Sequence, residues 1–159
     1  MLTLADNISI KFDDRELKKA LSNIRSLTKG DKTLMELIAI IANKNVFDHF
    51  DRHKSGSKTR WSDLASSTQK QRVKKKKSPN DMLRFTRHLQ NSIKPESKPL
   101  QAILKTNVEY AAIHNFGGQA GLGKKVTIPQ REFMWLDEKT KQNILKAISD
   151  RIKTKWKSG

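Results

Sequence analysis

Two short blocks decide the fold of this chain: YAAIHNFGG at residues 110–118 and IPQREFM at residues 128–134. In the first block, small and aromatic residues follow helical spacing and stop at a double glycine, which is typical of a helix end. The second block begins with a proline, which confines a strand to an edge or breaks it. The two blocks therefore predict a short helix over 109–116, a loop over 117–125 and a strand within 126–134.

The flanking sequence supplies longer helices. Residues 13–27 and 33–50 each carry apolar residues at helical spacing, and Gly30 separates them, which predicts an antiparallel helical hairpin. Residues 100–106 alternate in polarity and predict a strand. Asp137 can cap a final amphipathic helix. The predicted fold class is α+β, with an N-terminal helical hairpin, a small antiparallel sheet with a short helix, and a C-terminal amphipathic helix.

The length of 159 residues predicts one domain over 1–159. We divide it into a helical hairpin over 1–52, a basic mobile loop over 53–81, and an α+β core with its C-terminal helix over 82–159. The hydrophobic fraction is 35% and the aromatic fraction 6%. Because both are low for a compact globule, part of the chain is expected to be solvated or reserved for a subunit interface.

The charge is strongly positive: 33 Lys and Arg stand against 16 Asp and Glu, for a net charge of +17. Such a charge attracts polyanions. The densest run is Lys74, Lys75, Lys76 and Lys77, which suits phosphate contact and is equally consistent with a solvated loop. Phe85 follows the run. Its helical register with Leu89 favours a core position, and the alternative is a base-stacking platform.

The sequence has no cysteine, which excludes disulfides and thiolate chemistry and fits a reducing cytoplasm. Residues 1–10 show no signal peptide, and the longest apolar patch, at 34–42, is too short to span a membrane. We therefore expect no membrane partner.

Candidate catalytic groups are few. His49 and His53 are four residues apart near Asp48 and Asp51, so they could face one metal ion, but a hydrated helix end explains them better. His114 has no nucleophile motif near it, and we interpret it as a half-buried structural histidine. The glycines after it lack the lysine and hydroxyl of a phosphate loop. We predict no catalytic residue, no cofactor and no metal site.

Four blocks in order resemble the phage virion morphogenesis family, the tail-completion proteins of Mu-like phages. Residues 61–70 resemble its W-x-x-L…S-T…K segment, and 85–93 its T-G-x-L-x-x-S-I block. Residues 110–118 resemble Y-A-x-I-H-x-F-G-G, and 128–133 resemble I-P-A-R-P-F. Arg87 replaces the usual glycine, which disfavours a turn at 86–88. Glu132 replaces the usual proline, which predicts a less rigid segment.

The resemblance implies a non-enzymatic α+β subunit of a closed ring of identical copies, expected to be a hexamer, at the head-proximal end of the tail. There it caps the tail tube or joins tail to head. The implied partners are the tail-tube protein and the head-completion or connector protein, with possible non-specific DNA contact. The implied location is the virion tail, after assembly in the host cytoplasm. The alternative function is a sequence-independent nucleic-acid-binding accessory protein.

The resemblance also selects the structural and interface residues. Tyr110 and Phe116 are expected to pack the short helix onto the sheet, the glycines to permit a left-handed turn, and Arg131 to pair with a carboxylate within the subunit or across an interface. The full predicted set is Trp61, Leu64, Tyr110, His114, Phe116, Gly117, Gly118, Pro129, Arg131 and Phe133.

Overall fold

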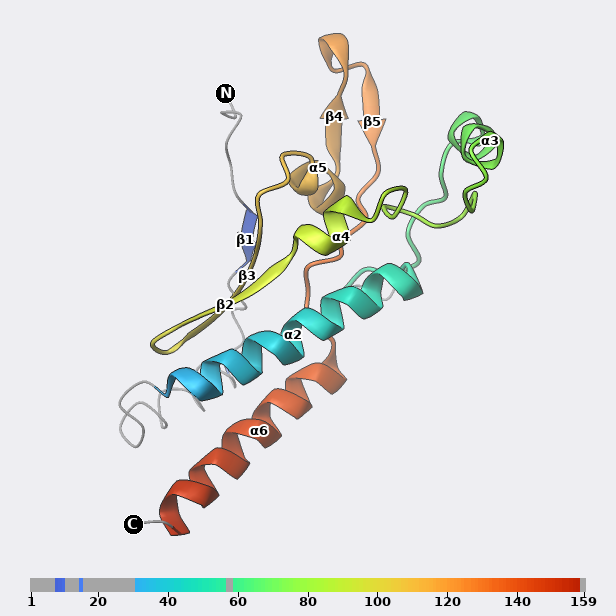
Figure 1. Cartoon of the computed structure of the whole chain (residues 1–159). Coiled ribbons are helices and arrows are strands. Elements are labelled where there is room, and N and C mark those ends of the chain that lie inside the picture. Colours follow the sequence, from blue (N-terminus) through green and yellow to red (C-terminus); the bar gives the residue numbers. More distant parts are fainter. Residues whose placement is uncertain (1–7, 11–14, 16–30, 57–58, 158–159) are drawn as a thin grey trace. The chain divides into compact units, whose positions relative to one another are not determined.

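The computed structural model of the chain describes residues 8–10, 15, 31–56 and 59–157 (Figure 1). The chain forms two compact units, each assembled from separate stretches of sequence. Unit 1 comprises residues 1–8, 46–93 and 106–135, and unit 2 comprises residues 9–45, 94–105 and 136–159. The two units are described separately.

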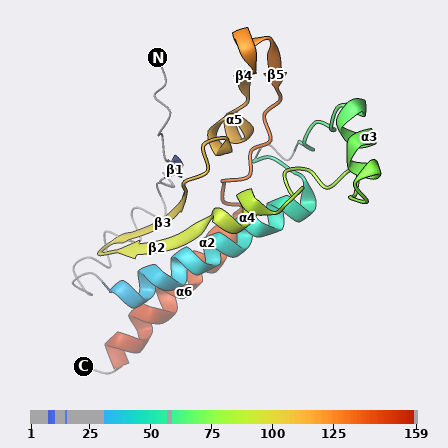
Figure 2. The same cartoon turned by 45° about the horizontal axis from the view of Figure 1, so that its top comes forward.

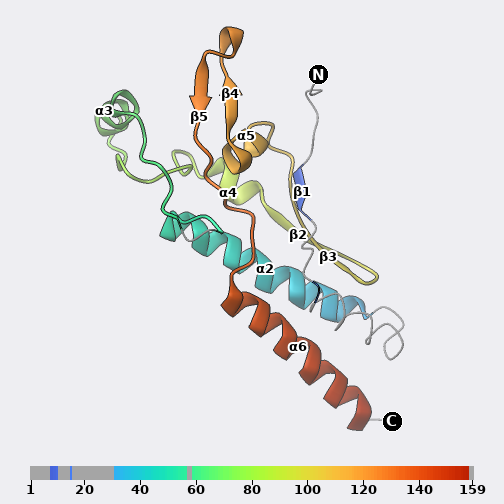
Figure 3. The same cartoon turned by 180° about the vertical axis from the view of Figure 1, so that it is seen from behind.

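The helices of unit 2 are antiparallel (Figures 1 and 3). Helix α2 (Lys32–Arg52) begins in this unit, and α6 (Glu138–Lys157) lies in it. The Asp31 carboxylate accepts a hydrogen bond from the Leu34 N–H at 3.1 Å and one from Arg151 Nε at 2.6 Å. Asp31 therefore caps α2 and joins its start to the C-terminal half of α6. The helices bury an apolar stripe comprising Leu34, Met35, Ile38, Ala39, Ala42, Ile144 and Ile148.

The larger sheet has three strands in the order β1-β3-β2, from β1 (Ile8–Ile10), β2 (Lys94–Lys98) and β3 (Gln101–Thr106). Strands β2 and β3 are antiparallel, with Pro95 opposite Leu104. A proline is tolerated here because β2 is an edge strand, where one missing N–H breaks no internal ladder.

Unit 1 packs short elements around aromatic side chains. Helices α3 (Ser66–Lys74), α4 (His88–Ser92) and α5 (Ala111–Phe116) lie in this unit with the end of α2. Phe50 contacts Phe133 with ring centroids 5.2 Å apart, and its ring meets the Trp61 ring edge-on at 6.0 Å. The buried apolar set also includes Val46, Met82, Leu89, Ile93, Val108, Ala111 and Met134.

A two-stranded hairpin follows α5 and extends beyond it (Figures 1 and 2). Strand β4 (Gly118–Ala120) pairs antiparallel with β5 (Val126–Ile128), and the 3₁₀ turn η1 (Leu122–Lys124) lies at the tip. Pro129 ends the hairpin, as the proline in the second block predicts.

The α+β fold class is confirmed, as are the helix predicted at 33–50, the strand at 100–106, the short helix ending at residue 116 and the capped C-terminal helix. In the last of these, the Asp137 carboxylate accepts the Thr140 N–H at 2.8 Å. The helix predicted at 13–27, and with it half of the expected hairpin, lies outside the described residues apart from Arg15.

Three local predictions differ from the structure. The segment 66–74, expected within a loop, is helix α3, and 118–120, also expected in a loop, is strand β4. Phe85 lies outside any helix and is 36% exposed, so its predicted core position is wrong. The physical reason is backbone geometry: Leu83 and Arg87 both take a φ of 58°, which a continuous right-handed helix does not allow. Arg87 itself takes the left-handed conformation that a glycine would favour, and the chain bends over residues 85–87.

Candidate functional site

The segment 129–134 is held to the rest of unit 1 by main-chain contacts. Buried Arg131 donates from Nε and Nη2 to the Ser62 carbonyl at 3.1 and 2.9 Å, and from Nη2 to the Asp63 carbonyl at 3.1 Å. The Arg131 N–H donates to the His114 carbonyl at 2.8 Å. These hydrogen-bond partners are carbonyl oxygens, which corrects the expectation of a carboxylate. The guanidinium fork thus joins the block at 128–133 to the block at 61–70, and the Arg131 main-chain N–H joins it to the block at 110–118.

Asn115 is the residue of this site that the sequence analysis missed. Its buried side-chain oxygen accepts the N–H groups of Phe133 and Met134, both at 3.0 Å. It therefore satisfies two main-chain donors that no sheet ladder pairs. Its position in the 110–118 block could have indicated this role. A polar side chain in an apolar helix needs a hydrogen-bond partner if it is buried.

Trp61 and Glu132 hold the other side of the segment. The Trp61 indole Nε1–H donates to the Glu132 carbonyl at 3.1 Å, and the Gly56 N–H donates to the Glu132 carboxylate at 2.8 Å. The glutamate that replaces the usual proline of the family therefore gains a contact that proline cannot make. Leu64 lies nearby in sequence, half-buried, and its carbonyl accepts the Gln69 side-chain amide at 2.8 Å.

The double glycine sets the path into the hairpin. Gly117 has a φ of 75°, and a Cβ there would lie 3.0 Å from the Gln130 main-chain nitrogen. Both the conformation and the space thus require glycine. Gly118 pairs with Ile128 in the first rung of the hairpin. The glycines were predicted to permit a left-handed turn. Gly117 does take a positive φ of 75°, but its ψ of 174° is extended, and the chain continues directly into β4.

Burial changes the pKa values of two titratable groups in the site. Burial lowers the pKa of His114, and the nearby positive charge of Arg131 lowers it further. Burial also lowers the pKa of Arg131, with a further contribution from Arg72. His114 is half-buried, its ring meets Tyr110 edge-on at 5.8 Å, and its Nδ1 has no hydrogen-bond partner among the described residues. These features favour a neutral imidazole with a packing role.

Several apolar side chains of α5 and the hairpin are exposed. Phe116 is 60% exposed and Tyr110 44%, so the prediction that both pack the helix onto the sheet is wrong. Leu122 at the hairpin tip is 98% exposed and Val126 52%. These four exposed apolar side chains all lie within residues 110–126.

The two histidines that suggested a metal site lie in different surroundings. His49 is buried, its Nδ1–H donates to the Phe133 carbonyl at 2.8 Å, and its ring stacks on Trp135 at 4.1 Å. His53 lies 5.6 Å from the Trp61 ring, with Nε2 4.0 Å from an Asp81 oxygen. In the described part of the chain, no three potential ligands among His, Cys, Asp and Glu form a metal-binding group.

None of the described helices combines the length and the apolar character needed to cross a bilayer. The four lysines at 74–77 are all exposed.

Comparison with known proteins agrees with this arrangement. The sequence profile of the phage virion morphogenesis family matches residues 12–153, which include every block that forms the site. The chain belongs to the phage virion morphogenesis family. It is also similar to "Mu-like prophage FluMu G protein 2" of Haemophilus influenzae, with 34% identity over 136 residues that cover 86% of this chain and 88% of that protein. No solved structure matches the chain.

Membership of the phage virion morphogenesis family makes this a phage structural or morphogenesis protein associated with the virion. The sequence blocks of the site stabilise the fold, because their polar side chains bind main-chain atoms. Arg131 donates to carbonyl groups, and Asn115 accepts from N–H groups.

Proposed function

We propose that this protein is a tail-completion subunit. Copies of it form a ring, with six as the expected number, which caps the head-proximal end of the tail tube and supports joining of tail to head. It catalyses no reaction. Its partners are further copies of itself, the tail-tube protein and the head-completion or connector protein.

The observation that carries this proposal is the exposed apolar surface on α5 and the hairpin. Phe116, Leu122 and Val126 project from a segment whose base is fixed by buried Arg131. Rigid support lowers the entropy lost when a surface is ordered on binding. An apolar surface with a preformed base therefore suits contact between subunits. The family membership supports the coarser point that the protein serves virion morphogenesis.

The first experiment measures native mass by light scattering, with and without the tail-tube protein. A ring of identical copies, alone or on addition of tube protein, supports the proposal. A monomer that ignores tube protein contradicts capping of the tube, and absence of the protein from purified particles contradicts any role in the virion.

A paired variant tests the surface itself. Replacing Phe116 and Leu122 with serine is expected to prevent ring formation while the variant remains folded by circular dichroism. Ile40→Ser is the control, because Ile40 is 59% exposed and lies on α2 in unit 2. Rings formed equally well by both variants would show that another surface joins the subunits.

A further inference from the structure

Helix α3 and the residues that follow it carry an isolated concentration of positive charge. We call residues 66–77 the basic arm. Lys70 and the four lysines at 74–77 are exposed, and no Asp or Glu occurs between Asp63 and Asp81. Within the part of the chain that the structure describes, no ion pair neutralises these five ammonium groups. Their charge is therefore available to a partner.

The end of α3 gathers the four consecutive lysines around one helix terminus. The Lys76 N–H donates to the Val73 carbonyl at 2.9 Å, the Lys77 N–H donates to the Arg72 carbonyl at 2.9 Å, and Lys76 takes a φ of 54°. This pair of hydrogen bonds is the Schellman arrangement, with lysine at the position that glycine usually occupies. Cations at a helix C-terminus are also stabilised by the helix dipole, so the arrangement tolerates their mutual repulsion.

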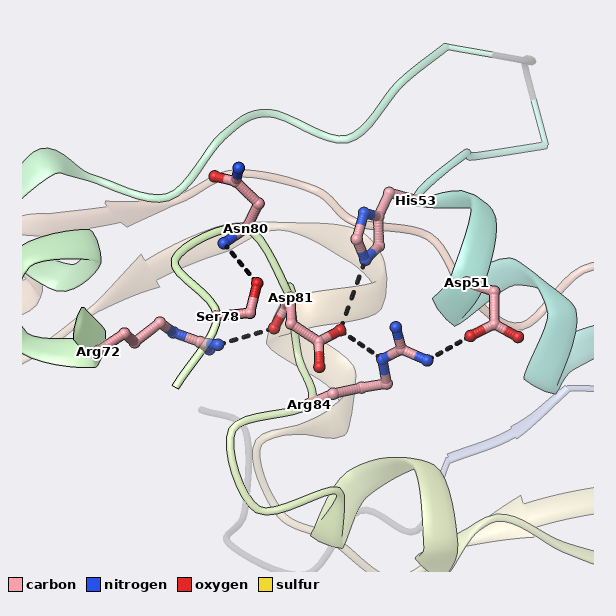
Figure 4. Close-up of polar contacts among 7 residues, drawn as sticks. All are labelled: Asp51, His53, Arg72, Ser78, Asn80, Asp81 and Arg84. Atoms are coloured by element: carbon pink, nitrogen blue, oxygen red, sulfur yellow. Dashed lines mark hydrogen bonds and ion pairs between the residues drawn. The ribbon is translucent and has the colours of Figure 1, made fainter. Parts of the chain in front are cut away.

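The basic arm is anchored to unit 1 by a chain of polar contacts (Figure 4). Arg72, the buried cation of α3, donates from Nη1 to the Asp81 carbonyl at 2.7 Å. The Asp81 carboxylate accepts Arg84 Nε at 2.6 Å, and Arg84 also pairs with Asp51 at the end of α2. His53 Nε2 lies 4.0 Å from the Asp81 carboxylate. The polar contacts of the anchor do not involve the side chains of the five exposed lysines.

Phe85 stabilises the same arrangement. The Arg72 guanidinium carbon lies 5.3 Å from the Phe85 ring centroid, and the Lys75 ammonium nitrogen lies 5.5 Å from it. Both distances are within the range of cation–π attraction. The ring therefore holds Lys75 near the buried anchor and keeps the lysine cluster together.

We propose that the basic arm binds the phosphate backbone of double-stranded DNA through Lys70 and the lysines at 74–77, without reading base sequence. Duplex DNA presents about one negative charge per 1.7 Å of its axis, so a compact group of five cations meets several phosphates at once. Lysine acts as a flexible point charge, which suits phosphate contact without base recognition.

An acidic protein surface is the competing partner, and the composition of the basic arm disfavours it. Lysine is depleted from the centres of protein–protein interfaces, where aromatic residues and arginine are enriched. The exposed part of the basic arm consists mainly of lysine and small polar residues, and its arginine is buried in the anchor. The DNA contact rests on this charge and geometry and is independent of the proposed ring.

The test compares two variants of the full chain with equal net charge. K74Q/K75Q/K76Q/K77Q removes four cations from the basic arm, and K44Q/K139Q/K146Q/K153Q removes four exposed lysines from unit 2. Fluorescence anisotropy measures the affinity of each variant and of the wild type for a short duplex of random sequence over a range of salt concentrations. Circular dichroism checks that all three proteins are folded.

If each lysine at 74–77 neutralises one phosphate, the slope of log affinity against log salt becomes less steep by about 3.6 in the first variant. Between about 50 and 200 mM salt, the wild-type affinity then falls about 150-fold more than that of the variant. The second variant is expected to keep most of the wild-type slope.

Equal slopes for the wild type and the first variant overturn the proposal. Equal changes in both variants also overturn it, because total charge then explains binding without the basic arm. If the wild type binds polyglutamate but not duplex DNA at the lowest salt, the partner is an acidic protein surface. Since none of these measurements uses ring assembly or tail-tube protein, failure here leaves the tail-completion proposal intact.

Discussion

Arg131 uses its charged side chain to fix main-chain geometry. Its guanidinium reaches two carbonyl oxygens, of Ser62 and Asp63, that lie almost 70 positions earlier in the sequence. A planar fork with several donors can satisfy both acceptors at once, whereas an ammonium group on a flexible stem cannot hold the same geometry. The identity of this residue therefore matters more than its charge.

Arg131→Lys is expected to lower the free energy of unfolding by about 2 kcal/mol, because at least one charge-assisted hydrogen bond is lost at a buried position. Urea denaturation measures the change. Arg87→Lys is the control, since Arg87 is exposed. A loss at Arg131 no larger than the loss at Arg87 contradicts the role given to the fork.

Gly117 lies where the 110–118 block meets the hairpin. Gly117→Ala combines an unfavourable φ with a close approach to Gln130, and we expect it to destabilise the fold by about 2 kcal/mol. Gly123→Ala is the comparison, because Gly123 (φ 68°, ψ 17°) lies in the left-handed region, which alanine tolerates better than the φ of 75° and ψ of 174° at Gly117, and a Cβ at Gly123 meets only a lysine side chain at 3.5 Å. Thermal unfolding should show the larger loss at Gly117, and equal losses would mean that its backbone conformation and its close approach to Gln130 together cost nothing extra.

His114 makes stability depend on pH. Burial and Arg131 lower its pKa below the ordinary value of 6.5, so the unfolded chain takes up a proton more readily than the folded one. Its contribution to stability is therefore complete above pH 6.5 and is lost as the pH falls through the folded pKa.

His114→Gln is expected to reduce the fall in the free energy of unfolding as the pH is lowered, as measured by urea unfolding at a series of pH values below 6.5. His88→Gln serves as the control, because His88 is exposed. Burial and Arg84 also lower the pKa of His53, so some decline should persist in the His114 variant. An unchanged pH slope in that variant is the contradicting result.

At the scale of elements, the spacing of apolar residues was sufficient to predict the long helices and insufficient to predict the short ones. Helix α2 and helix α6 bury apolar stripes, and those stripes are visible in the sequence. Helix α3 has no such stripe, and its lysines suggested a loop because like charges repel. Its stability depends on Arg72 and the Asp81 carbonyl, a tertiary contact that the sequence does not reveal.

The same limit explains the errors at the candidate site. The two blocks at 110–118 and 128–134 were identified from sequence, and they do lie together. Which side chains are buried was not predictable, because Asn115 and Phe116 are neighbours on a helix only six residues long. The polar residue faces the main chain of the neighbouring segment, and the aromatic residue faces outward.

The start of α2 offers an element-scale test. Asp31→Asn keeps a side-chain oxygen that can cap the helix but removes the charge that pairs with Arg151, whereas Asp31→Ala removes both. We expect the alanine variant to be less stable than the asparagine variant by about 1 kcal/mol, the usual value of an N-cap. Equal stability in thermal unfolding would mean that the cap contributes nothing.

At the scale of the whole molecule, unit 1 carries both the basic arm and a hairpin with exposed apolar side chains. The two surfaces suit different partners, because exposed lysines attract polyanions and exposed apolar side chains favour contact with protein. Under the two proposals, DNA and neighbouring subunits would therefore contact separate groups of residues.

Leu122→Ser tests that separation. Since Leu122 is 98% exposed, the change should leave the free energy of unfolding within about 0.5 kcal/mol of the wild type. It should reduce incorporation into particles, measured by quantitative mass spectrometry of purified virions, and leave the affinity for duplex DNA unaltered. A loss of DNA affinity equal to the loss of incorporation contradicts the division of surfaces.

Strand β2 affects how copies of this protein behave toward one another before assembly. It is the edge of its sheet, it contains Pro95, and exposed Lys94 and Lys98 lie at its two ends. Proline removes one donor and the lysines repel a second copy of the same strand, so these features oppose growth of the sheet from one molecule to the next. Newly made copies are therefore poor partners for one another through β2, even at high concentration, and the proposed association of subunits then depends on other surfaces.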